Sequence, residues 1–122
     1  MIVSVFVRRL KEGRTFAEFV EEWEADEGFG VPTRVFNAQS LEDPREIISV
    51  GFVDVSVEAL TEGLESVRGA ESVRHRRIHT VIESTSLRCM YELRSEHDFS
   101  STPVEIELGS PESLLAALAR AE

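Results

Sequence analysis

The stretch IVSVFVRRLKEGRTFAEFVEEW, residues 2–23, contains a strand pattern followed at once by a helix pattern. Three valines recur at every second position, as the period of a β-strand requires: Val3, Val5 and Val7. Gly13 interrupts this strand, and Thr15 with Glu18 has the form of a capping box at a helix start. Four apolar residues then follow with the spacing of one helix face: Phe16, Phe19, Val20 and Trp23. The stretch predicts a strand over 2–9 and a helix that begins after Thr15.

Three more segments have the composition or alternation of strands. They are 33–39, 46–54 and 87–93. Asp43-Pro44 lies between the first two and is typical of a turn, which indicates that these strands are antiparallel neighbours.

A second helix is predicted between the third and fourth strands. Ser56 is its expected N-cap, Gly63 is expected to weaken it by about 1 kcal/mol, and Gly69 is expected to interrupt it. We predict a further helical piece at 70–84, with an extended conformation of 77–83 as the alternative.

This order of elements, β-α-β-β-α-β with short connections, predicts an α+β, ferredoxin-like domain over residues 1–95. Its antiparallel sheet would have the strand order 4-1-3-2, with both helices on one face. Residues 96–122 form a C-terminal extension in which 104–108 alternates like a strand and Ser110-Pro111 can start a helix. We expect this tail to pack on its own subunit or on a neighbouring one.

The two faces of the predicted sheet differ in polarity. The purer apolar sets are expected against the helices: Val3, Val5, Val7, Ile48, Val50, Phe52, Leu87, Cys89, Tyr91 and Leu93. A mixed set is expected to point away from them: Phe6, Phe36, Ile47, Val53 and Met90, with Arg8, Arg34, Arg88 and Glu92. Leaving that set in water would expose more apolar surface than a monomer usually tolerates. The pattern therefore predicts a homodimer that packs sheet against sheet.

Composition restricts the class of partner. The chain of 122 residues carries a formal net charge of −10, which disfavours binding to nucleic acids and to anionic membrane surfaces. Its single cysteine excludes an internal disulfide framework. The first apolar run is too short for a signal peptide or a spanning helix, so we expect a cytoplasmic protein.

Three segments resemble the dimeric α+β-barrel superfamily: the strand Ile2–Arg9, the helix with Phe16, Phe19 and Trp23, and the strand Arg88–Leu93. Its members include antibiotic-biosynthesis monooxygenases, EthD-like proteins, haem-degrading monooxygenases and lactone isomerases. The resemblance implies a dimeric barrel with a small-molecule pocket. Trp23 matches a tryptophan of EthD-like members, whereas Glu27 stands where those members have a histidine.

Arginines on the strands are the first candidate site residues. Arg8 and Arg88 are expected close together on antiparallel neighbours, with Arg34 on the same face, and guanidinium groups bind carboxylates or enolates through paired hydrogen bonds. The alternative is that they form structural ion pairs with acids such as Glu92. The apolar walls would be Phe6, Phe36 and Met90, and Tyr91 could donate its hydroxyl into a pocket between sheet and helices.

His75 and His79 are the candidates for a metal or haem ligand. They lie one helical turn apart, but the neighbouring arginines disfavour a metal ion. Haem-degrading barrels take an axial histidine from the second helix, which the resemblance allows here. Such barrels also have an asparagine on the first strand and a tryptophan on the second helix, and this chain has neither. We therefore predict no metal and no cofactor.

Three functions are compatible with these residues. The first is a cofactor-free monooxygenase or isomerase that acts on an aromatic or enolic metabolite. The second is a non-catalytic ligand-binding or assembly dimer, and the third is a haem or metal protein. In each the expected partners are a second copy of the chain and a small organic molecule.

Overall fold

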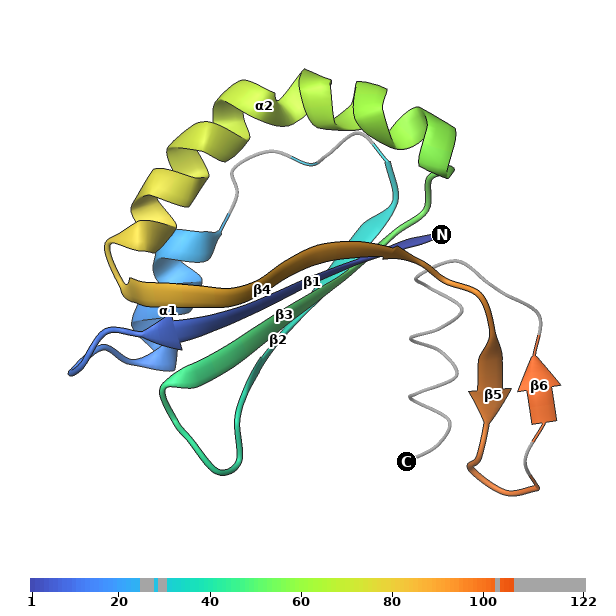
Figure 1. The fold of residues 1–122 in the computed structure, drawn as a ribbon, viewed down its shortest axis with the longest axis horizontal. Helices are drawn as coiled ribbons and strands as arrows, with labels where there is room; N and C mark the ends of the chain where they lie inside the picture. Colours follow the sequence, from blue (N-terminus) through green and yellow to red (C-terminus); the bar gives the residue numbers. More distant parts are fainter. Residues whose placement is uncertain (25–27, 29–30, 103, 107–122) are drawn as a thin grey trace.

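The computed structural model describes residues 1–24, 28, 31–102 and 104–106, and their side chains except those of 61–70 and 106. Its main elements are β1 (Ile2–Leu10), α1 (Phe16–Trp23), β2 (Thr33–Gln39), β3 (Glu46–Val53), α2 (Val57–His79) and β4 (Ile82–Glu92). The sheet has the order β2-β3-β1-β4, and every neighbouring pair is antiparallel. Both helices lie on one face of it (Figure 1). The ferredoxin-like arrangement and the strand order 4-1-3-2 are confirmed.

Both predicted helix starts are confirmed. The Thr15 hydroxyl accepts from the Glu18 backbone N–H at 3.2 Å, and the Thr15 N–H donates to the Glu18 carboxylate at 3.1 Å. Ser56 caps α2 by accepting from the backbone N–H of Ala59 at 3.1 Å. These bonds satisfy N–H groups that have no partner inside the helix.

The predicted interruption at Gly69 is wrong. Helix α2 continues through this residue to His79, and β4 begins at Ile82, so the helical prediction for the residues after His79 is also wrong. The alternative prediction, an extended conformation of 77–83, is correct only for the end of this segment, where β4 begins. Packing explains the difference, since Ile78 is buried in the core and this tertiary contact outweighs the low helix propensity of one glycine.

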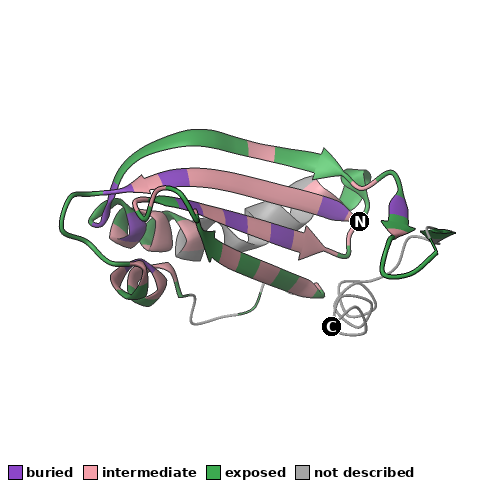
Figure 2. Ribbon diagram, turned by 90° about the horizontal axis from the view of Figure 1, so that it is seen from below, coloured by how far each residue is buried: buried purple, intermediate pink, exposed green. Residues whose placement is uncertain are grey.

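The apolar core lies at one end of the helix-covered face (Figure 2). It joins the end of β1, the start of β4, α1 and the last turn of α2. Its buried members are Leu10, Phe19, Ile47, Ile78, Val81 and Ile82. Phe19 is completely buried, whereas Phe16 and Trp23 are partly buried against this cluster, which supports the predicted inward face of α1.

The prediction of which sheet face lies under the helices is wrong for β1, β3 and β4. The Phe6 ring lies 6.4 Å from the His75 ring of α2, and the Arg8 guanidinium lies 5.8 Å from the Phe19 ring of α1. Even-numbered residues of β1 therefore face the helices, and Val3, Val5 and Val7 face away. Val50 and Tyr91 also face away from the helices, because they pair with Val5 and Val3 across the sheet.

We call the helix-free side the open face. Its described members include Val3, Val5, Val7, Arg9, Arg34, Phe36, Ala38, Glu46, Ile48, Val50, Phe52, Leu87, Cys89 and Tyr91. The physical reason for the reversal is that the large apolar residues at the strand ends, Ile2, Leu10 and Ile47, share the parity of Phe6 and Arg8 and complete the core. Of the predicted mixed set, only Arg34 and Phe36 point away from the helices.

The C-terminal extension contains a small hairpin separate from the main sheet (Figure 1). Strand β5 (Glu96–Asp98) pairs antiparallel with β6 (Val104–Ile106), which falls within the strand predicted at 104–108. The helix predicted from Ser110 lies outside the described residues. The packing of the tail on its own or another subunit stays a prediction.

Candidate functional site

Arg8 is a buried arginine on the helix-covered face of β1. Only 5% of the residue is exposed. Its Nη1 donates to the Ser49 hydroxyl at 3.3 Å, and that hydroxyl donates to the Asn37 side-chain oxygen at 2.6 Å. The Arg8 guanidinium carbon lies 4.4 Å from the centre of the Phe6 ring. Strands β1, β2 and β3 thus hold one cation by a single long hydrogen bond and by aromatic faces.

Arg88 places a second guanidinium group near the Phe6 ring. Phe6 and Arg88 are direct partners across β1 and β4, and the Arg88 guanidinium carbon lies 5.6 Å from the ring centre. Arg88 is exposed, whereas Arg8 is buried. Among the side chains that the structure describes, neither arginine forms an ion pair with a carboxylate. The structural ion pairs considered as the alternative are therefore not found there.

The charge on Arg8 is held in an unfavourable environment. Burial lowers the pKa of Arg8 to about 10, and the positive charges of Arg74 and Arg88 contribute to the same shift. Removing a cation from water without a counter-charge costs free energy, and nearby cations add to the cost. An anion bound beside Arg8 and Arg88 would offset both effects.

Helix α2 contributes a histidine and an ion pair to this region. His75 lies beside Phe6, and its Nε2 is 3.4 Å from a carboxylate oxygen of Glu71. Arg74 grips the same carboxylate through Nε at 3.0 Å and Nη2 at 2.7 Å. Its Nη1 donates to the Trp23 carbonyl at 2.9 Å, which ties α2 to the end of α1.

Burial lowers the pKa of His75, and the charge of Arg88 acts in the same direction. The Glu71 carboxylate opposes them, and Arg74 and Arg8 add smaller effects that also lower the pKa. The neutral imidazole is therefore favoured more than in free histidine.

The seven predicted ligand-binding residues are divided between the two faces. Phe6, Arg8, Arg88 and Met90 lie on the helix-covered face. Arg34, Phe36 and Tyr91 lie on the open face, where the Phe36 ring makes an edge contact with Phe52 at 5.9 Å. The prediction that the Tyr91 hydroxyl enters a pocket under the helices is therefore wrong.

The two histidine candidates differ in surroundings. His75 is half-buried between Glu71 and Phe6, and His79 is exposed one turn further along α2. Within the described part of the chain, no three histidine, cysteine or carboxylate side chains gather as a metal site would require.

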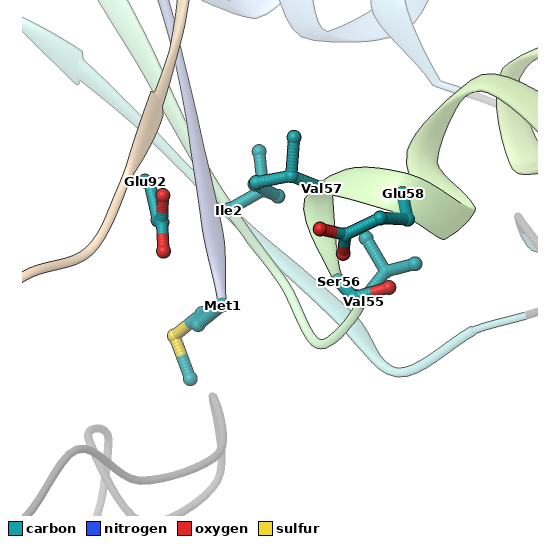
Figure 3. Close-up of a pocket in the computed structure, with 7 residues that line it drawn as sticks. All are labelled: Met1, Ile2, Val55, Ser56, Val57, Glu58 and Glu92. Carbon is teal, nitrogen blue, oxygen red and sulfur yellow. The ribbon is translucent and has the colours of Figure 1, made fainter.

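A separate pocket of about 400 Å³ lies at the other end of β1, beside the start of α2. It is lined by Met1, Ile2, Val55, Ser56, Val57, Glu58 and Glu92. Figure 3 shows its two carboxylates, Glu58 from α2 and Glu92 from β4. Among these seven residues they are the only charged side chains, and none of the arginines lines this pocket.

Four functional candidates were not identified from sequence: Asn37, Ser49, Glu71 and Arg74. Their contacts with Arg8 and His75 cross between strands or depend on the helix facing the sheet. The glutamate four residues before His75 was the one available signal, because i and i+4 share a helix face.

Comparison with known proteins supports the fold. No family model matches the sequence, and no curated protein matches it. The structure is similar to the crystal structure of a "putative Antibiotic biosynthesis monooxygenase" from Chloroflexus aurantiacus J-10-fl, with a TM-score of 0.54. The two chains are 17% identical, and the match covers 79% of this chain and 95% of the other. At that identity the likeness shows a shared fold.

No helix in the described part of the chain combines the length and the apolar composition that a bilayer crossing needs.

Proposed function

We propose that this protein binds a small aromatic molecule with an enol or phenol oxygen between the sheet and the helices. Arg8 and Arg88 hold the deprotonated oxygen, and Phe6 contacts the ring of the ligand. Met90, on the same face of β4, forms part of the apolar wall. The exposed Arg88 stands on the solvent side, and the buried Arg8 forms the deeper end.

One observation carries this proposal: Arg8 is only 5% exposed as a residue, and the hydrogen-bond partner of its guanidinium among the described residues is one hydroxyl. A guanidinium has five N–H donors. A buried cation with so few acceptors and two like charges nearby costs stability, unless it serves a bound anion. Groups with perturbed ionisation gather at functional sites for this reason.

The activity we propose is a cofactor-free monooxygenase or isomerase reaction. Loss of a proton from a CH₂ group conjugated with a carbonyl, adjacent to it or across an aromatic ring system, gives an enolate, whose negative oxygen the two arginines stabilise. Reaction of that carbanion with O₂ converts the CH₂ group to a carbonyl and releases one oxygen atom as water. Return of the proton to a different carbon would instead complete an isomerisation. The fold shared with a protein described as a monooxygenase supports the first outcome.

We also propose that the protein is a homodimer built on the open face. That face presents valine, isoleucine and phenylalanine side chains on β1 and β3, and Phe36 and Tyr91 are 38% and 47% exposed at its edges. A second copy would cover this apolar surface, whose charged members among the described residues lie at its margins: Arg34 on the edge strand β2, and Arg9 and Glu46 at the ends of β1 and β3. Phe6 and Met90 are not part of this interface, because they face the helices.

The second candidate function is a non-catalytic binding or assembly dimer. The open face favours it, because association alone accounts for those apolar residues. We do not propose a haem or metal protein, since the arginines that surround His75 repel a metal cation. The cytoplasmic location expected from the sequence stays a prediction.

Oxygen uptake tests the activity. With anthrone, an enolisable aromatic ketone, the wild type should consume oxygen and form anthraquinone faster than buffer does. Arg8→Met should lower kcat/KM about tenfold or more, because it deletes the charge and keeps an apolar stem of similar size. Arg9→Met is the matched control, since Arg9 is the next residue of β1 and pairs with Asp43 at 2.7 Å away from this site. Anthrone binding without oxygen uptake would favour the non-catalytic dimer.

A further inference from the structure

We propose that His75 takes the proton from the bound substrate and that Glu71 orients the imidazole for this step. The inference rests on the proposed function, because it requires the enolate oxygen to lie near Arg8 and Arg88. It assigns a catalytic role to a residue that the sequence suggested only as a metal or haem ligand.

The position of the ring supports this role. The His75 side chain is 24% exposed, and its ring centre lies 6.4 Å from that of Phe6. The guanidinium carbons of Arg8 and Arg88 lie 4.4 and 5.6 Å from the centre of the Phe6 ring. A ligand oxygen bound by the arginines beside Phe6 would therefore place the acidic CH₂ carbon of the same ring system within reach of an imidazole on α2.

The carboxylate that would orient His75 is itself fixed. Arg74 holds Glu71 with two short bonds, and Arg74 is anchored to the Trp23 carbonyl. Glu71 faces Nε2 of His75 at 3.4 Å. At this distance Glu71 acts on the imidazole through its charge, which favours a hydrogen on the nearer Nε2. In that tautomer Nδ1 keeps its lone pair and is the atom that accepts the proton.

The charges around His75 suit a base that starts neutral. Three arginines face it, Arg8 from β1, Arg88 from β4 and Arg74 from its own helix, and Glu71 is the opposing carboxylate. Burial and the arginines lower the pKa of His75, so the imidazole is free to accept a proton at neutral pH.

The proposed step is a proton transfer without any oxidant. A C–H bond of the CH₂ group breaks, its proton moves to Nδ1 of His75, and its electron pair enters the conjugated system that links this carbon to the carbonyl. The carbonyl oxygen takes the negative charge beside Arg8 and Arg88, and Glu71 stabilises the imidazolium. Return of a solvent-derived proton to the same carbon reverses the step.

Deuterium exchange measures this step by itself. Anthrone is incubated with the intact protein in D₂O without oxygen, and loss of its CH₂ proton signal is followed by NMR. His75→Gln should slow the catalysed exchange about 100-fold or more, while anthrone affinity from calorimetry changes less than about threefold. His79→Gln, exposed one turn away on α2, is the matched control and should exchange at the wild-type rate.

The pH profile separates a base from a structural residue, and it needs no variant that could fail to fold. The wild-type exchange rate should fall on acidification with an inflection below about pH 6.5, the usual value for histidine. Glu71→Gln should move this inflection to lower pH, because the carboxylate raises the pKa of His75.

The outcomes distinguish the two proposals. A wild type that binds anthrone but fails to catalyse exchange would overturn the role of His75, as would a His75→Gln variant with the wild-type rate or an exchange rate that does not fall on acidification. Each leaves the arginine site intact. A wild type that does not bind anthrone would overturn the proposed function and this inference together.

Discussion

Arg8 is a charged residue in a buried position, where its charge is disfavoured. Guanidinium groups are rarely this buried unless an acid pairs with them. Here the described partners are the Ser49 hydroxyl and two aromatic rings. Burial of large apolar side chains in the core, such as Phe19 and Ile47, offsets the free-energy cost of burying Arg8.

Arg8→Met should therefore stabilise the folded protein while it weakens function. Methionine keeps the packing of the stem and removes the buried charge, so the free energy of unfolding should rise by about 1–3 kcal/mol in urea titrations. Arg9→Met, which loses a surface pair with Asp43, should change it by less than about 1 kcal/mol. A clear loss of stability in Arg8→Met would mean that the guanidinium has a structural acceptor.

His75 should make stability depend on pH near neutrality. Its pKa is lowered in the folded state, so the unfolded chain takes up a proton first on acidification. Stability should therefore fall as the pH drops below about 6.5, and His75→Gln should weaken this dependence between about pH 7.5 and 5. Unfolding curves at several pH values measure the difference. Equal slopes in both proteins would contradict the lowered pKa.

Individual site residues were only partly predictable from sequence. Arg8, Arg88, Phe6 and Met90 could be grouped, because their strands are antiparallel neighbours and their positions share one parity. Arg34, Phe36 and Tyr91 were wrongly grouped in one site with Arg8 and Phe6. They lie on the other face of the sheet, and the sequence does not show which face of each strand the helices cover. No local pattern reports that an arginine will be buried.

At the scale of elements, local signals were sufficient for most boundaries. The capping box at Thr15, the cap at Ser56 and the turn at Asp43-Pro44 each depend on neighbouring residues and appear as predicted. The faces of the strands depend on contacts distant in sequence. Both faces of β1 and β3 are apolar enough to be buried, so alternation alone cannot tell which one the helices cover.

The pairing of β1 with β3 has a close contact that can be tested. A Cβ at Gly51 would lie 2.5 Å from the Ser4 hydroxyl oxygen and 3.8 Å from its Cβ. Gly51→Ala should therefore destabilise the protein by roughly 1 kcal/mol or more, as overpacking does. The double variant Ser4→Ala/Gly51→Ala should recover most of the loss in thermal unfolding, since only the hydroxyl clashes. If the second substitution restores nothing, the obstruction lies elsewhere.

At the scale of the whole molecule, the two sheet faces have separate proposed roles. The helix-covered face holds the arginines and His75, and the open face is the proposed dimer interface. The chain is acidic overall, with a formal net charge of −10, yet Arg8 and Arg88 lie over the Phe6 ring, and Arg74 lies near enough to Arg8 to lower its pKa. A positive site inside an acidic protein would select small anions and repel polyanions.

The dimer can be tested by adding a charge to the open face. Val5→Glu, in the middle of that face on β1, should convert the dimer to monomers at micromolar concentration in sedimentation velocity, because a buried carboxylate would face its own copy. Leu41→Glu is the matched control, since Leu41 is fully exposed beside the turn between β2 and β3 and should leave the dimer intact. A wild type that sediments as a monomer would contradict the interface.

The binding of 4-nitrophenolate tests the arginine site most directly. This aromatic anion should bind the wild type in calorimetry at about pH 8.5, where Arg8 remains charged, and nitrobenzene should bind much more weakly. Arg8→Met should weaken the affinity for 4-nitrophenolate about tenfold or more, and Arg9→Met should not. Equal affinity of the wild type and Arg8→Met, or equal binding of nitrobenzene and 4-nitrophenolate, would contradict an anion site at Arg8.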